Sequence, residues 1–444
     1  MMSAIARRIN SLHEYMHDEE LKNECRMKPS DFTRKSSLNF VNLILLFLTK
    51  TGLTNKMELI IFFEKIGESA VTNGALTQAR LKLKPIVFKK LQERYLTLFY
   101  KDEKVRKEFK KYLLLACDGS RIELPHHKSL VKIFGGTKSK FGKIMSCMGN
   151  SSMIYDVLNK FVFDFEIGTF KTSEKTLALK NLTNLFQMDF LNNVKKIFIF
   201  DRGYRSIQFF HYFMEKEEKF VFRLRIQDYK KERMKLRNND QWTKIEITKN
   251  RLNYVKDEEL KSILLDVGSL NLRIVTVTLV TGEIEYLITN LDKKNFKHSD
   301  IVEIYRLRWG IEVSFKILKS FLRMENISGL SKIAVQQDLF SQILAYNIIN
   351  DLRNGSQNKK DENTEDSAFE KKKQGKVNMN MVIGHFKLRI LMIITEKDNE
   401  KQENVLYALI FKLSKYYTNT STKKYKHPKN TPSRKNPTNN RRSF

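Results

Sequence analysis

Residues 300–325 read DIVEIYRLRWGIEVSFKILKSFLRME and predict one long helix with two distinct faces. Its apolar residues recur at intervals of three and four, as a buried helical face requires. They are Ile301, Ile304, Ile311, Phe315, Leu318 and Leu322. Such a face must lie against a folded core, so the chain has to provide a layer that this helix covers.

The same helix carries a polar stripe formed by Tyr305, Arg308, Glu312 and Lys319. Their spacings of three, four and seven place them within an arc of about 60°. Arg308 and Glu312 alone would be read as an ordinary ion pair on a solvated face. Lys319, two turns further along the stripe, makes a functional interpretation stronger.

Two aspartates are predicted at the ends of buried strands. KYLLLACDGSRIELP begins at Lys111 and contains an apolar run that ends at Asp118, and VKKIFIFDRGYRS contains a second run that ends at Asp201. Continuous apolar runs of this length indicate strands that are buried on both faces. Two apolar stretches and a helix near residues 173–186 lie between them, which gives three strands, a helix and a strand. Either aspartate alone would be read as a turn residue.

The pattern Y-x2-R-x3-E-x6-K at Tyr305 to Lys319 resembles the YREK signature of the DDE transposases of bacterial insertion sequences, often called insertion-sequence family four. The resemblance implies an RNase H-like catalytic domain in which Asp118, Asp201 and Glu312 are the catalytic carboxylates. The segments DGS at Asp118 and DRGY at Asp201 match the family's first and second carboxylates, and VFRLR with Arg223 resembles its strand after the second aspartate.

This chemistry explains the residue types. Phosphodiester cleavage by water needs an activated nucleophile and a stabilised leaving oxygen, which two Mg²⁺ ions about 4 Å apart supply. Carboxylate oxygens are suitable ligands for such hard ions, so we expect Asp118, Asp201 and Glu312 to bind two Mg²⁺, with Mn²⁺ able to substitute. Arg308 and Lys319 are expected to contact DNA phosphates, while Tyr305 contacts a phosphate or orients Arg308.

The formal net charge of +31 predicts a polyanionic partner, with double-stranded DNA as the leading candidate. The chain has no apolar run of eighteen residues or more and nothing at Met1 that resembles a signal peptide, so we expect a soluble, cytoplasmic, nucleoid-associated bacterial protein without membrane contact. Cys25, Cys117 and Cys147 lack CxxC spacing, which argues against a disulfide framework and a zinc site.

We expect an α/β fold, with an RNase H-like mixed sheet flanked by helices, and seven segments along the chain. These are a helical N-terminal DNA-binding domain (1–110), the first part of the catalytic domain (111–224), a β-rich insertion (225–295), the catalytic helix and the next helix (296–353), a polar linker (354–377), C-terminal helices (378–418) and a disordered basic tail (419–444). In the first segment, Arg80, Lys82 and Lys84 are placed where a helical domain could contact phosphates, although a plain helical bundle fits equally well.

The insertion contains alternating segments such as TKIEITKN and LRIVTVTLV, which indicate strands. Family members carry a similar insertion that helps to form a hairpin DNA end. Trp242 is its only tryptophan; a sheet-face or core role is the more ordinary interpretation, and stacking on a DNA base is the functional one.

The sequence therefore predicts a cut-and-paste transposase that binds the ends of its element, cleaves there, and joins the ends to target DNA. A homodimer is expected in the DNA complex because two ends must be cut together. Two alternatives remain: a catalytically silent repressor derived from a transposase, and an RNase H-like nuclease that cuts without joining.

Overall fold

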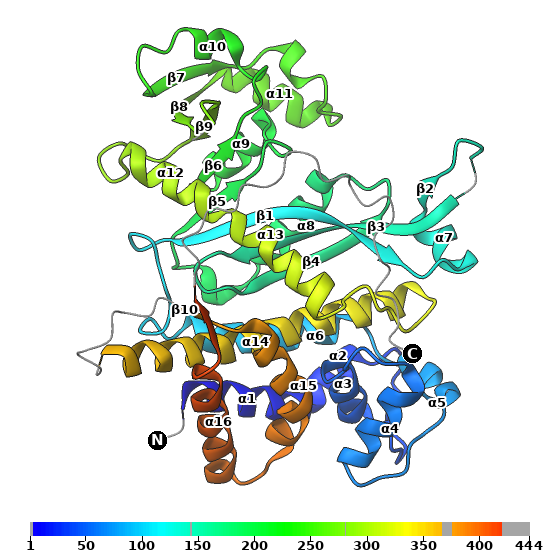
Figure 1. The fold of residues 1–444 in the computed structure, drawn as a ribbon. Helices are drawn as coiled ribbons and strands as arrows, with labels where there is room; N and C mark the ends of the chain where they lie inside the picture. Colours follow the sequence, from blue (N-terminus) through cyan, green and yellow to red (C-terminus); the bar gives the residue numbers. More distant parts are fainter. Residues whose placement is uncertain (1–2, 143, 280, 366–374, 420–444) are drawn as a thin grey trace. The chain divides into compact units, whose positions relative to one another are not determined.

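The computed structural model describes residues 3–142, 144–279, 281–365 and 375–419 (Figure 1). The chain forms two compact units. The sheet unit comprises residues 105–120 and 150–315, and the helical unit comprises residues 1–104, 121–149 and 316–444. Within the described residues, no helix is both long and apolar enough to cross a membrane.

A single sheet of nine strands dominates the fold, in the order β2-β3-β1-β5-β6-β9-β8-β7 with β4 beside β3. Its strands are β1 (Leu113–Leu124), β2 (Gly136–Lys138), β3 (Ile144–Asp156), β4 (Val162–Thr169), β5 (Lys196–Phe200), β6 (Lys219–Arg223), β7 (Asp240–Glu246), β8 (Ser269–Thr278) and β9 (Ile284–Thr289). β5 is parallel to both β1 and β6, whereas β6, β9, β8 and β7 pair in antiparallel fashion. The order β4-β3-β1-β5-β6 is that of an RNase H-like core, as the sequence predicted.

The middle of this sheet is held together by aromatic packing. Every residue of β5, KIFIF, is buried, which is typical of a parallel strand covered on both faces. Phe200 of β5 stacks on Phe222 of β6 with ring centroids 4.5 Å apart. Phe213, from the helix that connects these strands, packs on both rings. The connection between β5 and β6 is therefore a rigid part of the core.

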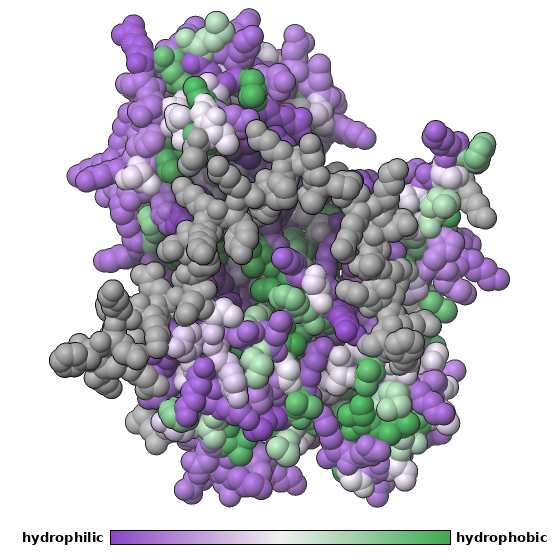
Figure 2. Space-filling view, viewed as in Figure 1, coloured by the Kyte–Doolittle hydropathy of each residue, from purple (hydrophilic) through white to green (hydrophobic). Residues whose placement is uncertain are grey.

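Within the described residues, the sheet unit also contains eight helical segments. They are α8 (Glu174–Phe186), η1 (Asp189–Leu191), α9 (Ile207–Glu215), α10 (Lys230–Met234), η2 (Lys249–Leu252), α11 (Glu258–Val267), α12 (His298–Leu307) and α13 (Trp309–Lys316), of which the last ends at the border of the unit. Hydrophilic side chains cover most of the viewed face over β7 to β9 and α10 to α11 (Figure 2).

The β-rich insertion expected at residues 225–295 is not a separate sheet. Its strands β7, β8 and β9 extend the central sheet, because β9 pairs with β6 from Val221↔Thr289 to Arg223↔Leu287. Alternating polarity predicted the strands, but it does not specify which edge they join.

The long helix expected over residues 300–325 is interrupted twice. α12 ends at Leu307 and α13 begins at Trp309, with Arg308 still in a right-handed helical conformation between them. Residues Ile317–Phe321 then form a π-helical turn. A π-turn shifts the side chains that follow it around the helix axis, so the regular stripe predicted through Lys319 is not maintained.

The helical unit contains the elements that remain. They are α1 (Ala4–Met16), α2 (Glu19–Cys25), α3 (Phe40–Leu48), α4 (Asn55–Lys65), α5 (Asn73–Arg80), α6 (Ile86–Tyr100), α7 (Lys128–Phe134), the π-turn, α14 (Lys332–Glu365), α15 (Met379–Thr395), α16 (Asn399–Ser414) and the two-stranded ladder of β10 (Gly375–Val377) and β11 (Tyr417–Asn419). α14 is its central helix and packs against α3, α6, α15 and α16.

The polar linker expected from residue 354 is, as far as Glu365, the last part of α14. Ser356 and Lys360 lie one turn apart and are buried, and Gln357 bonds to the backbone of Val377 and Gly375. The segment contains no proline, so its polarity does not end the helix. The rest of the expected linker, residues 366–374, and nearly all of the expected tail, residues 420–444, lie outside the described residues.

Arg80 does not have the surface role expected from the sequence. Its side chain is buried and bonds to Gln337, the Ala334 carbonyl and the Asp338 carboxylate. Lys50 pairs with Asp338 as well, at 2.7 Å. Arg80 and Lys50 hold the pKa of buried Asp338 down at about 2, against the upward effect of burial. Arg80 therefore stabilises the helical unit from within.

Candidate active site

The two predicted aspartates lie on adjacent parallel strands. Asp201 directly follows the last residue of β5, as expected, whereas Asp118 lies within β1, which continues to Leu124 instead of ending at the aspartate. Cys117 of β1 is in register with Phe200 of β5, and Asp118 and Asp201 are the next residues in each strand's path. Residues at the same level of two neighbouring parallel strands lie side by side in the sheet. The register of β1 and β5 therefore brings these carboxylates to the same place.

Residues of α12 and α13 contact these two aspartates. The Tyr305 hydroxyl donates to Asp201 Oδ1 at 3.1 Å. Arg308 donates through Nη2 to Glu312 Oε1 at 2.7 Å and lies within 3.5 Å of Asp118 Oδ2 through Nη1. We call these five residues the carboxylate cluster. All five were predicted site residues, and the structure brings them together in the sheet unit.

Burial makes the cluster electrostatically unusual. The Asp118 side chain is 21% exposed, and burial raises the pKa of this carboxyl from 3.8 to about 6. The nearby charges of Asp201 and Glu174 also raise the pKa, while the Gly119 amide and Arg308 lower it. Because burial disfavours the charged form of Asp118, a bound cation would stabilise that form. Asp118 is therefore a strong candidate for binding a cation.

Arg308 supplies positive charge from within the protein. Its side chain is only 9% exposed, and its Nε has no hydrogen-bond partner among the described residues. Burial alone would lower the pKa of Arg308, but Tyr305, Glu312, Asp201 and Asp118 raise it instead. The pKa of Tyr305 is likewise raised, mainly by burial. Arg308 is therefore always charged and Tyr305 is a neutral donor at physiological pH.

Three predicted residues lie elsewhere. Arg223, at the end of β6, pairs with Glu285 Oε1 at 2.5 Å, and its charge lowers the pKa of Tyr305, so it flanks the cluster. Trp242 is 36% exposed on β7, the outermost strand, which is separated from β6 by β9 and β8. Lys319 belongs to the helical unit, where it donates to the Arg121 carbonyl and lies 3.6 Å from Glu325.

Glu174 is a fourth carboxylate that the sequence did not single out. It is the first residue of α8, after the N-cap Ser173. A Cβ atom added to Gly119 would lie 2.8 Å from its Cγ, and one added to Gly203 would lie 4.0 Å from its Oε2. The only signal for Glu174 in the sequence was its position at the start of the helix expected near residues 173–186, which is a common position for an acidic residue.

The described residues contain no group of three or more His, Cys, Asp or Glu side chains already arranged to hold a metal ion. In the cluster, the Arg308 guanidinium lies between Asp118 and Glu312, where it supplies the balancing charge. The donor set nevertheless suits a divalent cation, because buried carboxylate oxygens are the ligands that Mg²⁺ and Mn²⁺ prefer.

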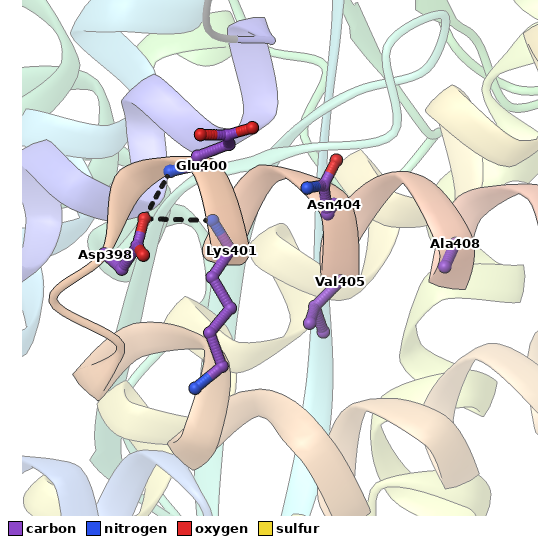
Figure 3. Close-up of a pocket in the computed structure, with 6 residues that line it drawn as sticks. All are labelled: Asp398, Glu400, Lys401, Asn404, Val405 and Ala408. Atoms are coloured by element: carbon purple, nitrogen blue, oxygen red, sulfur yellow. Dashed lines mark hydrogen bonds between the residues drawn. The ribbon is translucent and has the colours of Figure 1, made fainter.

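Another surface feature is a pocket formed along α16 of the helical unit by Asp398, Glu400, Lys401, Asn404, Val405 and Ala408 (Figure 3). The Asp398 carboxylate accepts hydrogen bonds from the backbone nitrogens of Glu400 and Lys401, which is ordinary capping of a helix start. These contacts explain the polar residues of this pocket without a ligand.

An RNase H-like core with one aspartate on β1, a second directly after the neighbouring strand β5 and a glutamate on a later helix defines a domain of the DDE class. Residues 109–348, more than half of the chain, match the family model described as the transposase DDE domain. The chain belongs to this family.

Individual relatives are distant and partial. One named "Probable transposase for insertion sequence element IS5377", from Geobacillus stearothermophilus, is 25% identical over 162 residues, or 35% of this chain and 39% of the relative. The "Transposase for insertion sequence element IS421" from Escherichia coli is 32% identical over 66 residues, or 15% of this chain and 18% of that protein. The chain thus matches less than half the length of either relative.

Similarity to a solved structure is also distant. The cryo-EM structure of a piggyBac transposase synaptic complex with hairpin DNA aligns over 90% of this chain and 84% of that chain, at 9% identity and a TM-score of 0.38. A likeness at this level supports no argument about the site.

Proposed function

We propose that this protein is an insertion-sequence transposase of the YREK type, which binds the ends of its element, cleaves DNA there and joins the ends to target DNA. The observation that carries the proposal is the gathering of Asp118 and Asp201, from adjacent parallel strands, with Tyr305, Arg308 and Glu312 from α12 and α13. Membership of the transposase DDE domain family supports the same conclusion.

Asp118, Asp201 and Glu312 are the proposed ligands of two divalent cations, Mg²⁺ or Mn²⁺. When bound, such ions activate a water nucleophile and stabilise the leaving oxygen of a phosphodiester. The cluster fits this role because Asp118 is costly to ionise without added positive charge. Glu312 is 35% exposed and bonded to Arg308 alone among the described residues, so its carboxylate can exchange this partner for an ion.

Arg308 is proposed to contact a DNA phosphate next to the scissile bond, because a guanidinium matches the geometry of a phosphate. Tyr305 holds Asp201 through its hydroxyl and is therefore a positioning residue. Arg223, beside Tyr305, offers a further cation to the DNA backbone.

The remaining parts of the proposal rest on the family resemblance. They are recognition of the element ends by the N-terminal helices, formation of a hairpin at the DNA ends with help from residues 225–295 and Trp242, and a homodimer that cuts both ends together.

The central experiment measures binding and cleavage side by side. We expect Asp118→Ala, Asp201→Ala and Glu312→Ala to abolish cleavage and joining while end binding persists, because phosphate contacts come from Lys and Arg. A gel-shift assay on terminal-repeat DNA and a cleavage assay in Mg²⁺ should be run on each folded variant. A variant that cuts at the wild-type rate would remove its residue from the triad.

The gel-shift and cleavage assays, together with a strand-transfer assay, separate the alternatives. A wild type that binds ends but never cuts would be a silent repressor. A wild type that cuts without joining in a strand-transfer assay would be an RNase H-like nuclease.

A further inference from the structure

Glu174 lies close to both backbone segments that carry the aspartates. Gly119 follows Asp118 directly, and Gly203 is two residues beyond Asp201. The Glu174 side chain approaches both glycines, with its Cγ and Cδ 2.8 and 2.9 Å from where a Cβ of residue 119 would be. It therefore lies near the β1 residue that follows Asp118 and near the turn that follows Asp201.

An ordinary role for Glu174 does not explain this approach. An acidic residue in the first turn stabilises a helix through the helix dipole, and Ser173 already caps α8 through the Thr176 amide. That role is equally well served by a carboxylate directed into solvent. Among the described residues, the Glu174 side chain has no hydrogen bond or ion pair, so nothing else holds it against Gly119.

A second observation comes from Tyr204, whose ring is buried and 1% exposed. Its hydroxyl has Asp118 and Glu174 among its charged neighbours, with Ser152 also close. It nevertheless completes no hydrogen bond of normal geometry within the described residues. A buried hydroxyl without a partner is costly, which indicates that a group present in the working protein completes this side of the site.

Charge supports the same interpretation. Asp118, Asp201, Glu312 and Glu174 contribute four carboxylates, and among the described residues Arg308 is the one cation bonded within the group. Glu174 lies close enough to Asp118 for their negative charges to repel each other. Mutually repelling carboxylates around one crevice are relieved by divalent cations.

We propose that Glu174 is a fourth carboxylate of the site and helps to hold a divalent cation between Asp118 of β1 and Asp201, which follows β5. This inference rests on the function proposed above. It also explains why position 119 carries no side chain: a Cβ there would displace Glu174.

The test measures Mn²⁺ binding to the full-length, metal-free protein by calorimetry, without DNA and without turnover. Glu174→Gln removes the charge at nearly constant shape and should weaken Mn²⁺ binding by about tenfold or more. Glu303→Gln is the matched control, because Glu303 lies exposed on α12 and pairs with Arg306 instead of the cluster. This control should bind Mn²⁺ like the wild type.

Three further measurements make the result robust. The rise of the thermal midpoint with added Mn²⁺ reports binding to the folded state and should be smaller for Glu174→Gln. Glu174→Asp keeps the charge but withdraws the carboxylate, and an intermediate affinity is expected, so the inference can be tested even if the Gln variant folds poorly. In cleavage assays, the Mg²⁺ concentration for half-maximal rate should rise in Glu174→Gln, with DNA binding unchanged.

The outcomes distinguish the two proposals. If Asp118→Asn loses Mn²⁺ binding while Glu174→Gln and Glu174→Asp bind like the wild type, the role of Glu174 is wrong and the proposed function stands. If the wild type itself binds no Mn²⁺, or Asp118→Asn binds it normally, the metal site fails and both proposals fall.

Discussion

Arg308 is the side chain that joins the parts of the carboxylate cluster. It contacts Glu312 on its own helix and Asp118 on β1, and its guanidinium lies 5.6 Å from the centre of the Tyr305 ring. The i,i+4 pair with Glu312 was predictable from helical spacing. The contact with Asp118 was not, because it depends on how α13 packs against the sheet.

The first prediction at the residue scale concerns Arg308→Ala. A guanidinium cannot ligate a metal ion, so loss of Arg308 should reduce cleavage through misplaced DNA, and the defect should persist at saturating Mg²⁺ or Mn²⁺. Arg306→Ala, which removes an exposed guanidinium two residues away, is the control and should cut normally. Full rescue of Arg308→Ala by added metal would contradict a role in DNA positioning. Lys319→Ala tests the same idea for the second cation of the signature.

The second prediction concerns pH. The pKa of Asp118 in the folded protein is about 6, above its ordinary 3.8, so the folded state favours the protonated acid. This group therefore stabilises the fold below about pH 4, and the contribution is lost as the pH rises through about 6. In metal-free buffer at pH 8, Asp118→Asn should be more stable than the wild type by up to about 3 kcal/mol.

Thermal or urea unfolding of both proteins from pH 8 to pH 5 checks this expectation. The difference in stability should shrink as the pH falls. A wild type that is more stable than the variant at pH 8, with EDTA present, would show that Asp118 is not electrostatically strained.

The residue scale also shows what sequence can identify. Asp118, Asp201, Tyr305, Arg308 and Glu312 could be singled out because buried apolar runs and helical spacing are local patterns. The strand end predicted at Asp118 was wrong, because β1 continues to Leu124. Glu174 could not, because its significance arises from the space left by Gly119 and Gly203 in other segments. Arg80 looked like a surface cation because nothing in its neighbourhood in the sequence shows that Asp338 is its partner.

At the scale of elements, the sheet extension formed by β7, β8 and β9 contains a buried arginine that is paired with a partly buried aspartate. Arg273 of β8 is fully buried and forms two hydrogen bonds with Asp240 of β7, at 2.7 and 2.6 Å. It also donates to the carbonyls of Leu291 and Phe296. The pair therefore links the outermost strand to the segment that leads into α12.

Asp240→Ala tests this link. It leaves the Arg273 charge buried without its carboxylate, and such changes cost about 3–5 kcal/mol. We expect a loss of that size in chemical denaturation, and weaker protection of β7 and β8 from hydrogen exchange. Glu246→Ala, an exposed change at the other end of β7, should alter stability by less than about 0.5 kcal/mol. Equal effects of the two substitutions would show that the pair does not anchor the strand.

Some features of the elements could not be predicted from the periodicity of apolar residues. The strands of the RNase H-like core were predicted in order because buried runs are distinctive. The end of α14 was misplaced because a polar segment was interpreted as a loop, although Ser356 and Lys360 face the interior one turn apart. The π-turn at Ile317–Phe321 leaves no mark in the apolar spacing.

At the scale of the whole molecule, the charge of +31 is divided between internal and external uses. Arg8, Lys50, Arg80 and Arg273 are each paired with buried aspartates or with carboxylates at the core. These cations stabilise the fold and cannot also neutralise a nucleic acid. Residues 420–444, by contrast, contain eight Lys and Arg residues and no acidic residue.

Removal of residues 420–444 should therefore weaken binding to any DNA about equally and make the dependence of affinity on salt less steep. The truncation begins after Asn419 so that the ladder of β10 and β11 is kept. Binding of terminal-repeat and unrelated duplexes should be compared between 50 and 200 mM salt, the range over which such contacts weaken strongly. A selective loss of terminal-repeat binding would instead assign recognition to the tail.

The position of Arg308 has one more consequence, which is thermodynamic. A divalent ion that reaches Asp118 and Glu312 must displace a guanidinium bonded to Glu312 at 2.7 Å, and a DNA phosphate is a good acceptor for the displaced group. Ion and DNA should then each raise the protein's affinity for the other by the same factor, since coupling between two ligands is reciprocal. The protein would thereby bind ions more tightly when an end is bound than when it is free, and Arg308 would favour the metal-loaded state on DNA.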